Sequence, residues 1–351
     1  MHNETHIHQS ILSPQLSVSF VIPTLNSERT LRECLHSIRE QTYPPDCVEI
    51  IIADAGSTDN TLTIAKEFDV DKIVTNPLKT GEAGKTEGIK VSRGDIIAII
   101  DSDNILDNPE WLNRMLAPFA DSEIIASEPI LYSRRDKDPA LTRYFAMLGM
   151  NDPLCLFLGN YDRQSMITDK WTGLNVKEED HGAYLKLTLK EDQLPTIGAN
   201  GFIFRHVLLD SVKWEPYFFD IDVVQQAVQA GFPCLAKVKC GIVHLYCESL
   251  KDFTRKQDRR IRDFLFFSQQ RQRSYPWNRQ CRLGAVRFCI DTLLVVPLLI
   301  QMARGWLRKK DPAWLFHLPV CWITLLVYGV ATVKKMLCIQ PKPKSRTNWQ
   351  K

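Results

Sequence analysis

Polar side chains gather where three apolar, strand-like segments of the chain end. Asn26 and Glu28 follow the first of these segments, Asp54 follows the second, and Asp101 and Asp103 follow the fourth. Each cluster alone is compatible with turn and cap chemistry, because Asp, Asn, Ser and Gly favour turns. In open α/β sheets, however, ligands bind at the carboxyl ends of parallel strands. Three such clusters therefore predict a ligand site along one edge of a sheet.

Asp101 and Asp103 are the most informative pair. Two carboxylates separated by one residue at a strand end can converge on one hard cation, whose open positions are then filled by phosphate oxygens. Magnesium or manganese bound in this way bridges a diphosphate and neutralises a leaving group. The chain lacks a GxxxxGK[ST] motif, which excludes a P-loop ATPase, and the absence of GxGxxG after the first strand argues against a Rossmann dehydrogenase.

Strand-like and helical segments alternate through the first hundred residues. Such alternation implies βαβ units and a mainly parallel sheet. Strand interiors without polar alternation fit a sheet that is covered on both faces. Residues 104–197 show few sustained periods, and the strand–helix pattern returns afterwards. Strands are expected at 16–22, 48–53, 72–75, 95–100 and 197–205, and helices after Ser27 and at 58–68, 81–92 and 221–230.

Residues 18–61 and 81–104 together resemble glycosyltransferase family 2. The resemblance extends over roughly residues 16–260, and its motifs follow one another in the family's order. It implies the GT-A fold, a Rossmann-like α/β mixed sheet flanked by helices. It also implies a nucleotide-diphospho-sugar donor and, in most members, inversion at the anomeric carbon.

The resemblance assigns the nucleoside to the first two loops. Asp54 matches the first acid of the family's Asp-Asp-Gly-Ser motif, which holds the base, whereas Ala55 replaces the second acid. This replacement leaves the identity of the base open. The residues that match the loop touching the nucleoside are Pro23, Thr24, Asn26 and Glu28.

The diphosphate and the metal are assigned to residues further along the chain. Lys85 takes the basic position of the family's Ala-Arg-Asn-x-Gly segment and would reach the diphosphate. Asp101 would face the ribose or the metal, and Asp103 would be a metal ligand. His244 matches a late His that completes metal or diphosphate binding, although a structural role for a single His in an apolar run stays open. The resemblance thus implies a divalent cation, Mg²⁺ or Mn²⁺.

Two acids follow a Gly-rich segment at 198–201, which resembles the family's segment beneath the donor sugar and the acceptor and contains Asn200. Asp220 matches the catalytic base of the family's Glu-Asp-x-Asp motif, in which the Glu is here replaced by Phe. An inverting transfer to a hydroxyl needs such a carboxylate to take the proton. Asp222 is the alternative base, and either acid could instead cap the following helix. Arg255 is expected to contact the diphosphate, although it could instead line a membrane-facing helix.

Charge is distributed unevenly along the chain. Residues 251–351 hold 21 Lys and Arg against five Asp, a net charge of +16, whereas the rest carries −13. Two apolar stretches lie in the basic part, at 288–303 and 314–333, and the second is long enough to span a bilayer. We therefore expect an anionic membrane, and not nucleic acid, as the partner of this region. Two spans and a re-entrant hairpin bent at Pro297 and Pro319 both fit.

The composition and the cysteine spacing exclude several classes of protein. A composition of 44% hydrophobic and 24% charged residues excludes a mainly disordered chain. The ten Cys form no CxxC pair, so a zinc ribbon or a redox pair is unexpected. The chain is expected to have five parts. They are a disordered N-terminus at 1–15, a GT-A domain at 16–250, basic interface helices at 251–287, a membrane-associated helical hairpin at 288–335 and a basic tail at 336–351. A chain cut after residue 277 is expected to be soluble.

The sequence as a whole predicts a metal-dependent, inverting glycosyltransferase of the hexosyltransferase type. The donor is expected to be UDP- or GDP-linked, and the acceptor a lipid-linked saccharide, a polyprenyl phosphate or an envelope glycan. The expected location is the cell membrane, with the catalytic domain on the cytoplasmic face. One alternative is a processive polysaccharide synthase, although its QxxRW motif is broken here at 270–277. The other is a non-catalytic, nucleotide-binding scaffold of an envelope complex.

Overall fold

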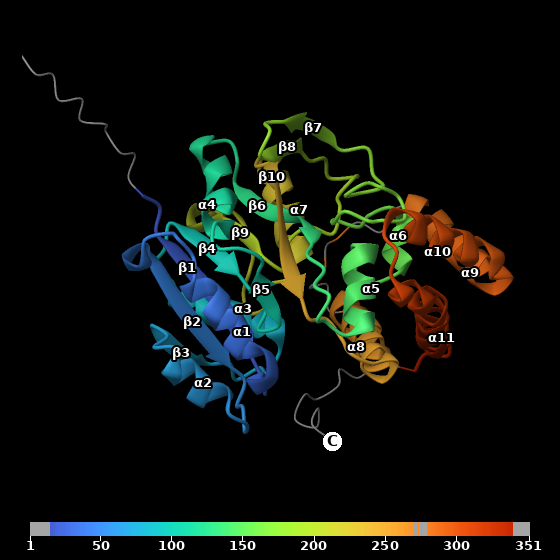
Figure 1. Ribbon diagram of the computed structural model, residues 1–351, viewed down its shortest axis with the longest axis horizontal. Coiled ribbons are helices and arrows are strands. Elements are labelled where there is room, and N and C mark those ends of the chain that lie inside the picture. Colours follow the sequence, from blue (N-terminus) through green and yellow to red (C-terminus); the bar gives the residue numbers. More distant parts are fainter. Residues whose placement is uncertain (1–14, 270–272, 274, 276–278, 340–351) are drawn as a thin grey trace, which may run out of the picture.

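The computed structural model describes residues 15–269, 273, 275 and 279–339. Almost all of the expected disordered N-terminus, most of the expected basic tail and most of the broken QxxRW segment lie outside these residues. Within the described part of the chain, a ten-stranded sheet forms the centre of the molecule, and helices cover both of its faces (Figure 1).

The sheet joins a parallel half to a mixed half. Its strands are β1 (Val18–Thr24), β2 (Val48–Asp54), β3 (Lys72–Thr75), β4 (Ile96–Ile99), β5 (Asn104–Leu106), β6 (Ala126–Tyr132), β7 (Lys177–Asp180), β8 (Tyr184–Thr188), β9 (Phe202–Arg205) and β10 (Cys234–His244). Their order is β3-β2-β1-β4-β9-β6-β10-β8-β7, and β5 pairs with β10. β1 runs parallel to β2 and β4, whereas β9 runs antiparallel to β4 and β6. The expected mixed α/β sheet is thus confirmed.

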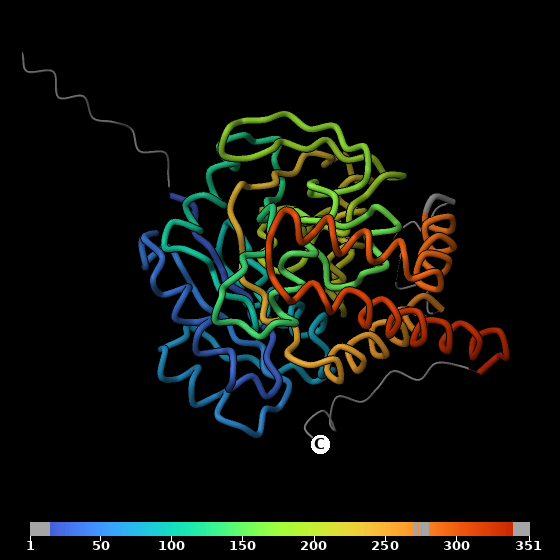
Figure 2. The backbone as a smooth tube through the Cα atoms, turned by 45° about the vertical axis from the view of Figure 1, so that its right-hand side comes forward, coloured from blue at the N-terminus to red at the C-terminus, as the bar shows by residue number. Residues whose placement is uncertain are grey.

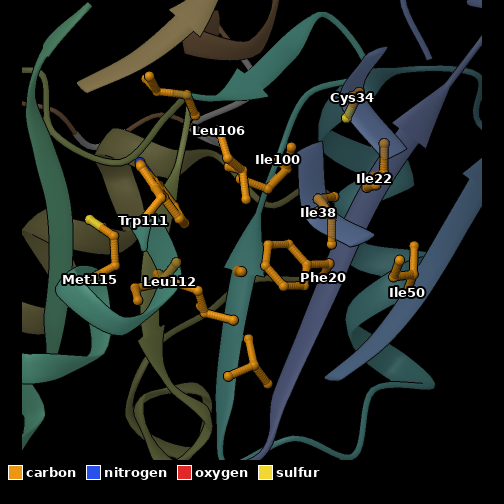
Figure 3. Packing of buried hydrophobic residues seen from close by; sticks show 14 of the residues in the cluster. Phe20, Ile22, Cys34, Ile38, Ile50, Ile100, Leu106, Trp111, Leu112 and Met115 are labelled. Carbon is orange, nitrogen blue, oxygen red and sulfur yellow. The ribbon is translucent and has the colours of Figure 1, made fainter. Parts of the chain in front are cut away.

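Both faces of the parallel half are buried, which explains why its strands lack polar alternation. The helices that lie against the sheet are α1 (Glu28–Arg39), α2 (Thr61–Glu67), α3 (Gly81–Lys90), α4 (Trp111–Leu116) and α7 (Asp220–Gln229). Phe20 and Ile22 of β1 join a core cluster with Ile38 of α1 and Trp111 of α4 (Figure 3). Val21, which points the other way, joins a second cluster that includes Ile89 of α3.

The region between β5 and β9 contains more regular structure than its sequence predicts. It holds α5 (Ala140–Leu148) and α6 (Leu154–Leu158) besides three strands. β7, whose four residues are all charged and exposed, is an edge strand that pairs antiparallel with β8. Charged side chains on an edge strand discourage further strand pairing, so these residues suit that position.

After β10, the described residues form four α-helices: α8 (Leu250–Gln269), α9 (Arg279–Leu294), α10 (Val296–Arg308) and α11 (His317–Met336). The last three lie on the side of the molecule opposite α1 and α2 (Figures 1 and 2). The first apolar stretch is broken at Val295, where α9 and α10 meet at an angle of 93°. The expected bend near Pro297 is therefore present, and Pro297 is the second residue of α10. Pro319 lies in the first turn of α11, and the helix continues past it.

By length and composition, the helical segment Pro312–Met336 could cross a membrane, and the bent pair α9–α10 could form one broken span. These helices are attached to the body of the protein. Trp314 and Val320 are buried in one cluster with Tyr144 of α5 and Phe253 of α8. The C-terminal region is therefore packed on the sheet domain.

Candidate active site

Asp54 organises the loop after β2. Its buried carboxylate accepts hydrogen bonds from Thr24 Oγ1 (3.0 Å), from the backbone N–H groups of Gly56 and Ser57 (2.8 Å each) and from Ser57 Oγ (2.5 Å). Thr24 and Asp54 are paired across the ends of β1 and β2. The carboxylate thus fixes the shape of this loop, and its contact with a nucleotide base stays a prediction.

Asn26 and Glu28 connect the loops that follow β1 and β2. Asn26 has a left-handed backbone (φ 52°) and accepts a hydrogen bond from the N–H of Thr58 at 2.8 Å. Glu28 accepts hydrogen bonds from the backbone and side-chain amides of Asn60 at 3.0 and 2.9 Å. The structure therefore brings the predicted nucleoside residues together at one edge of the sheet.

Lys85 and Asp220, predicted to contact the diphosphate and to act as base, form a buried ion pair. A Cβ at Gly84 would lie 2.8 Å from the Cβ of Pro23, so the glycine allows α3 to approach β1 and to carry Lys85 into the site. The Lys85 ammonium lies 2.8 and 2.7 Å from the two carboxylate oxygens of Asp220. Burial raises the pKa of Asp220 to about 7, although the charge of Lys85 acts in the opposite direction.

Asp103 lies beside His244, at the end of β10, and Lys256 of α8. The distances from its carboxylate are 3.5 Å to His244 Nε2 and 3.9 Å to Lys256 Nζ. Burial alone would raise the pKa of Asp103, but His244 and Lys256 hold that pKa below its usual value. Among the described residues, no three His, Cys, Asp or Glu side chains form a group that could hold a metal. Asp101 thus does not complete a three-ligand group with Asp103 and His244.

Asn200 links the Gly-rich segment to the loop after β4. It has a left-handed backbone (φ 53°), accepts a hydrogen bond from Asn104 Nδ2 at 3.1 Å and donates one to the Tyr132 hydroxyl at 3.0 Å. Asn104 in turn accepts a hydrogen bond from the N–H of Asp101 at 3.0 Å. A Cβ at Gly198 would lie 2.8 Å from the backbone carbonyl of Asp220, so this segment also touches the predicted base.

A buried charged cluster supports the Gly-rich segment, and the sequence did not lead us to it. The Arg163 guanidinium contacts Glu128 at 2.6 Å and donates to the carbonyl oxygens of Ala199 (2.8 Å) and Asn200 (3.2 Å). Lys237 also pairs with Glu128. Arg163 and Lys237 hold the pKa of Glu128 below its usual value, against the effect of burial. One signal was available, since Glu128 is a single charge within the apolar strand β6.

Asp222 and Arg255 have partners outside this arrangement. The buried carboxylate of Asp222 accepts hydrogen bonds from Arg273 Nε (2.7 Å) and from the N–H of Tyr275 (3.1 Å). These contacts favour a structural role for Asp222 over that of the alternative base. Arg255 donates a hydrogen bond to Asp252 at 2.9 Å within α8. Its predicted contact with a diphosphate stays a prediction.

Residues 19–174 match the family model described as "Glycosyl transferase family 2". Glycosyltransferase AglE of Haloferax volcanii is 31% identical over 102 residues, which are 28% of this chain and 33% of that protein. A dolichyl N-acetyl-alpha-D-glucosaminyl phosphate 3-beta-D-2,3-diacetamido-2,3-dideoxy-beta-D-glucuronosyltransferase of Methanococcus voltae is 39% identical over 88 residues, 23% of this chain and 27% of that protein. The chain therefore matches about a third or less of the length of these relatives.

A solved structure of similar fold is that of the mannosyltransferase PcManGT from Pyrobaculum calidifontis in complex with GDP-Man and Mn2+. It superposes with a TM-score of 0.50 at 15% sequence identity and covers 92% of this chain and 87% of its own. This likeness concerns the fold. Residues 19–174 are thus similar to the glycosyl transferase family 2 model, and the fold of the chain is a mixed sheet of the GT-A type.

Proposed function

We propose that the protein is a membrane-attached inverting glycosyltransferase. It would transfer a sugar from a UDP- or GDP-linked donor to a lipid-linked saccharide, a polyprenyl phosphate or an envelope glycan. The observation that carries this proposal is the buried pair of Lys85 and Asp220, which lies against the Gly-rich segment. A cation for the diphosphate and a carboxylate for the acceptor hydroxyl therefore lie within one site, close enough for both to take part in a single displacement.

The residues around Asp103 fit a divalent cation that also binds the donor. Asp103 supplies a carboxylate and His244 an imidazole, both of which suit Mn²⁺, and carboxylates suit Mg²⁺. His244 Nδ1 is buried and has no hydrogen-bond partner among the described residues. Because the described side chains form no complete ligand set, the remaining ligands would come from the diphosphate and water. The cation would neutralise the charge of the leaving diphosphate.

The proposed roles of the protein's own residues follow from their contacts. Lys85 would turn from Asp220 to the diphosphate oxygens, and Asp220 would then accept the proton of the attacking hydroxyl. Asn200 would hold the segment beneath the donor sugar, because it is fixed by Asn104 and Tyr132. A phosphate acceptor is already ionised and would need little help from Asp220.

The proposed location is the cytoplasmic face of the cell membrane. The net charge of +16 after residue 250 favours anionic lipid, whereas the −13 of the remaining chain would be repelled from it. The donor site would thus stay open to nucleotide-sugars in the cytosol.

The test is donor turnover by the purified full-length protein in detergent. UDP-glucose, UDP-N-acetylglucosamine and GDP-mannose are supplied with a polyprenyl phosphate or a simple lipid-linked sugar, in Mn²⁺, Mg²⁺ or EDTA. We expect release of the nucleoside diphosphate with one donor, and loss of release in Asp220→Asn for a hydroxyl acceptor or in Asp103→Asn for either acceptor. Asp46→Asn, at an exposed position of the sheet domain, is the matched control.

Either of two results would favour another function over this proposal. Long polymeric products would favour a processive polysaccharide synthase. Saturable nucleotide binding without turnover of any donor would favour a non-catalytic scaffold. Thermal stabilisation separates binding from turnover, because a donor at about 100 times its dissociation constant adds roughly 2.7 kcal/mol to the free energy of unfolding.

A further inference from the structure

The three C-terminal helices expose apolar side chains on the side that faces away from the sheet domain. Leu293 of α9, Leu307 of α10 and Val330 of α11 are 62%, 80% and 53% exposed. On α9 the exposed large apolar residues recur at positions 283, 286, 290, 293 and 294, which is one face of a helix. We call the exposed apolar side chains of α9, α10 and α11 the outer face. A surface of this kind marks an interaction site.

The lengths of α9 and α10 exclude each of them as a single span. With 16 and 13 residues and a rise of 1.5 Å per residue, they are about 24 and 20 Å long, whereas the hydrocarbon core measures about 30 Å. The bend of 93° between them prevents them from forming one straight rod. Both helices can nevertheless lie in the plane of a membrane surface.

α11 is long enough to cross a bilayer, but polar contacts fix its inner side to the protein. His317 contacts the Tyr144 hydroxyl at 2.8 Å and Gln301 at 2.7 Å, and Thr324 accepts a hydrogen bond from Gln257 of α8 at 3.0 Å. His317, Thr324 and Gln257 are fully buried.

A crossing α11 would have to break these contacts or draw α8 into the hydrocarbon. α8 contains six Lys and Arg and three Asp, and charged side chains at the bilayer centre are costly. The packing of α11 is therefore incompatible with a complete crossing.

The charge of the region fits a lipid surface of opposite sign. Residues 279–339 contain nine Lys and Arg and only two acids. Both acids face inward: the Asp291 side chain is 14% exposed and lies 3.4 Å from Arg287, and Asp311 is buried between Arg134 and Arg143. An apolar face rimmed by an excess of basic side chains is typical of helices that lie in the interface of an anionic membrane.

We propose that α9, α10 and α11 form an in-plane membrane anchor that enters one leaflet of an anionic bilayer and that no helix of this group crosses it. This inference rests on the proposed membrane attachment and defines its geometry. The sheet domain and the end of α11 then lie on the same side of the membrane. α8 joins the anchor to the candidate site, because Lys256 contacts Asp103 and the next residue, Gln257, contacts Thr324.

The native Cys338, exposed two residues beyond α11, reports on the topology. The full chain is placed in sealed vesicles and treated with a membrane-impermeant maleimide, before and after the vesicles are opened with detergent. Val207→Cys, on the exposed surface of the sheet domain, reports the orientation, and Cys338→Ser identifies the label. We expect vesicles that label at position 207 to label equally at Cys338. Labelling of Cys338 only after opening would mean that α11 crosses, which overturns the inference.

Flotation on vesicles tests the outer face itself. We expect Leu293→Glu combined with Leu307→Glu to lower binding to vesicles containing phosphatidylglycerol by at least about tenfold, because both changes put a charge into the apolar contact. Val207→Glu, at a similarly exposed position elsewhere, should bind like the unchanged protein. Equal binding of the double variant, or a dimer in solution that does not bind vesicles, would overturn the inference. Donor turnover in detergent distinguishes these outcomes from a failure of the proposed transferase activity.

Discussion

Lys85 binds the carboxylate of Asp220 through both oxygens, so Asp220 cannot take a proton from a hydroxyl while this ion pair is intact. A diphosphate brings at least two negative charges to the same ammonium and would compete with Asp220 for it. Donor binding would then release the base only when there is a sugar to transfer. Three predictions at the scale of single residues follow from this arrangement and from the neighbouring Asp103.

Asp220→Asn should lower transfer to a hydroxyl acceptor by about 10²–10⁴-fold and leave donor affinity nearly unchanged, since general-base catalysis typically contributes this much. Initial rates and donor titrations measure the two effects separately. Asp222→Asn is the comparison. It should lower thermal stability more than the rate, because Asp222 accepts hydrogen bonds from Arg273 and Tyr275. The reverse pattern would make Asp222 the base.

The pH profile should show an acidic limb near pH 7 for a hydroxyl acceptor. The base acts only when it is ionised, and the pKa of Asp220 is about 7, so kcat/KM should rise as the pH increases through that value. Lys85→Met removes the charge that lowers this pKa, and the limb should move to higher pH. Lys90→Met, at a more exposed position of the same helix, should leave the limb in place. A profile without this limb would contradict a base role for Asp220 and is expected with a phosphate acceptor.

Asp103→Asn should abolish the dependence of donor binding on Mn²⁺, because it removes the carboxylate that lies beside His244. Donor titrations with and without Mn²⁺ measure the effect. Asp46→Asn should behave like the unchanged protein. Retained activity with unchanged Mn²⁺ dependence in Asp103→Asn would contradict the metal assignment.

At the scale of elements, the parallel half of the sheet was predictable from the sequence, whereas the buried charged cluster that supports the Gly-rich segment was not. β1 to β4 are apolar strands separated by short helices, so hydrophobic pattern and turn residues mark their ends. β6 and the adjoining part of β10 form round a buried charged cluster, and the partner of Glu128 is Arg163, 35 positions further along the chain. Local pattern carries no information on such a pairing, because it is set by tertiary contacts.

The candidate site was likewise predictable only in part from the sequence. The loops after β1, β2 and β4 were expected to meet, because parallel strands end at the same edge. The ion pair of Lys85 with Asp220 and the hydrogen bonds of Arg273 to Asp222 join segments 135 and 51 positions apart. They depend on how α3 and α7 pack, which no spacing in the sequence encodes.

Arg163 should act on the Gly-rich segment as a positioning residue. Arg163→Lys keeps a charge beside Glu128 but cannot hold both carbonyl oxygens of the segment. We expect a lower kcat with a small change in the free energy of unfolding. Arg163→Met should in addition destabilise the fold by about 3–5 kcal/mol, the usual effect of breaking a buried ion pair. Kinetics and urea denaturation measure both. Lys239→Met, on the exposed side of β10, is the control, and an unchanged kcat in Arg163→Lys would contradict the positioning role.

At the scale of the whole molecule, the C-terminal helices belong to the folded body. The sequence suggested that a chain cut after residue 277 would be soluble, but α11 and the turn before it cover Tyr144, Phe145 and Phe253. Removal of these elements would expose this apolar cluster to water. The proposed anchor is therefore also a structural layer of the folded protein.

A chain cut after residue 277 should accordingly unfold at a lower temperature than the full chain or aggregate. Thermal unfolding in detergent compares the two. Within the full chain, Trp314→Ala should cost about 3–5 kcal/mol, as for other large buried side chains, whereas Leu315→Ala at the exposed neighbouring position should have little effect. A cut chain as stable as the full chain would show that the sheet domain folds independently.

α8 contacts both the candidate site and the C-terminal helices. Lys256 contacts Asp103 in the loop after β4, and Gln257 contacts Thr324 of α11, so two adjacent residues of α8 link the candidate site to the proposed anchor. If the proposed transfer and membrane attachment hold, this link would fix the depth of the site relative to the lipid surface. An acceptor oxygen at headgroup level would then come within reach once, and the added sugar would move the new chain end away from the bilayer. We therefore expect the protein to add one sugar to each acceptor. The product should then leave, because it no longer fits between the candidate site and the lipid surface.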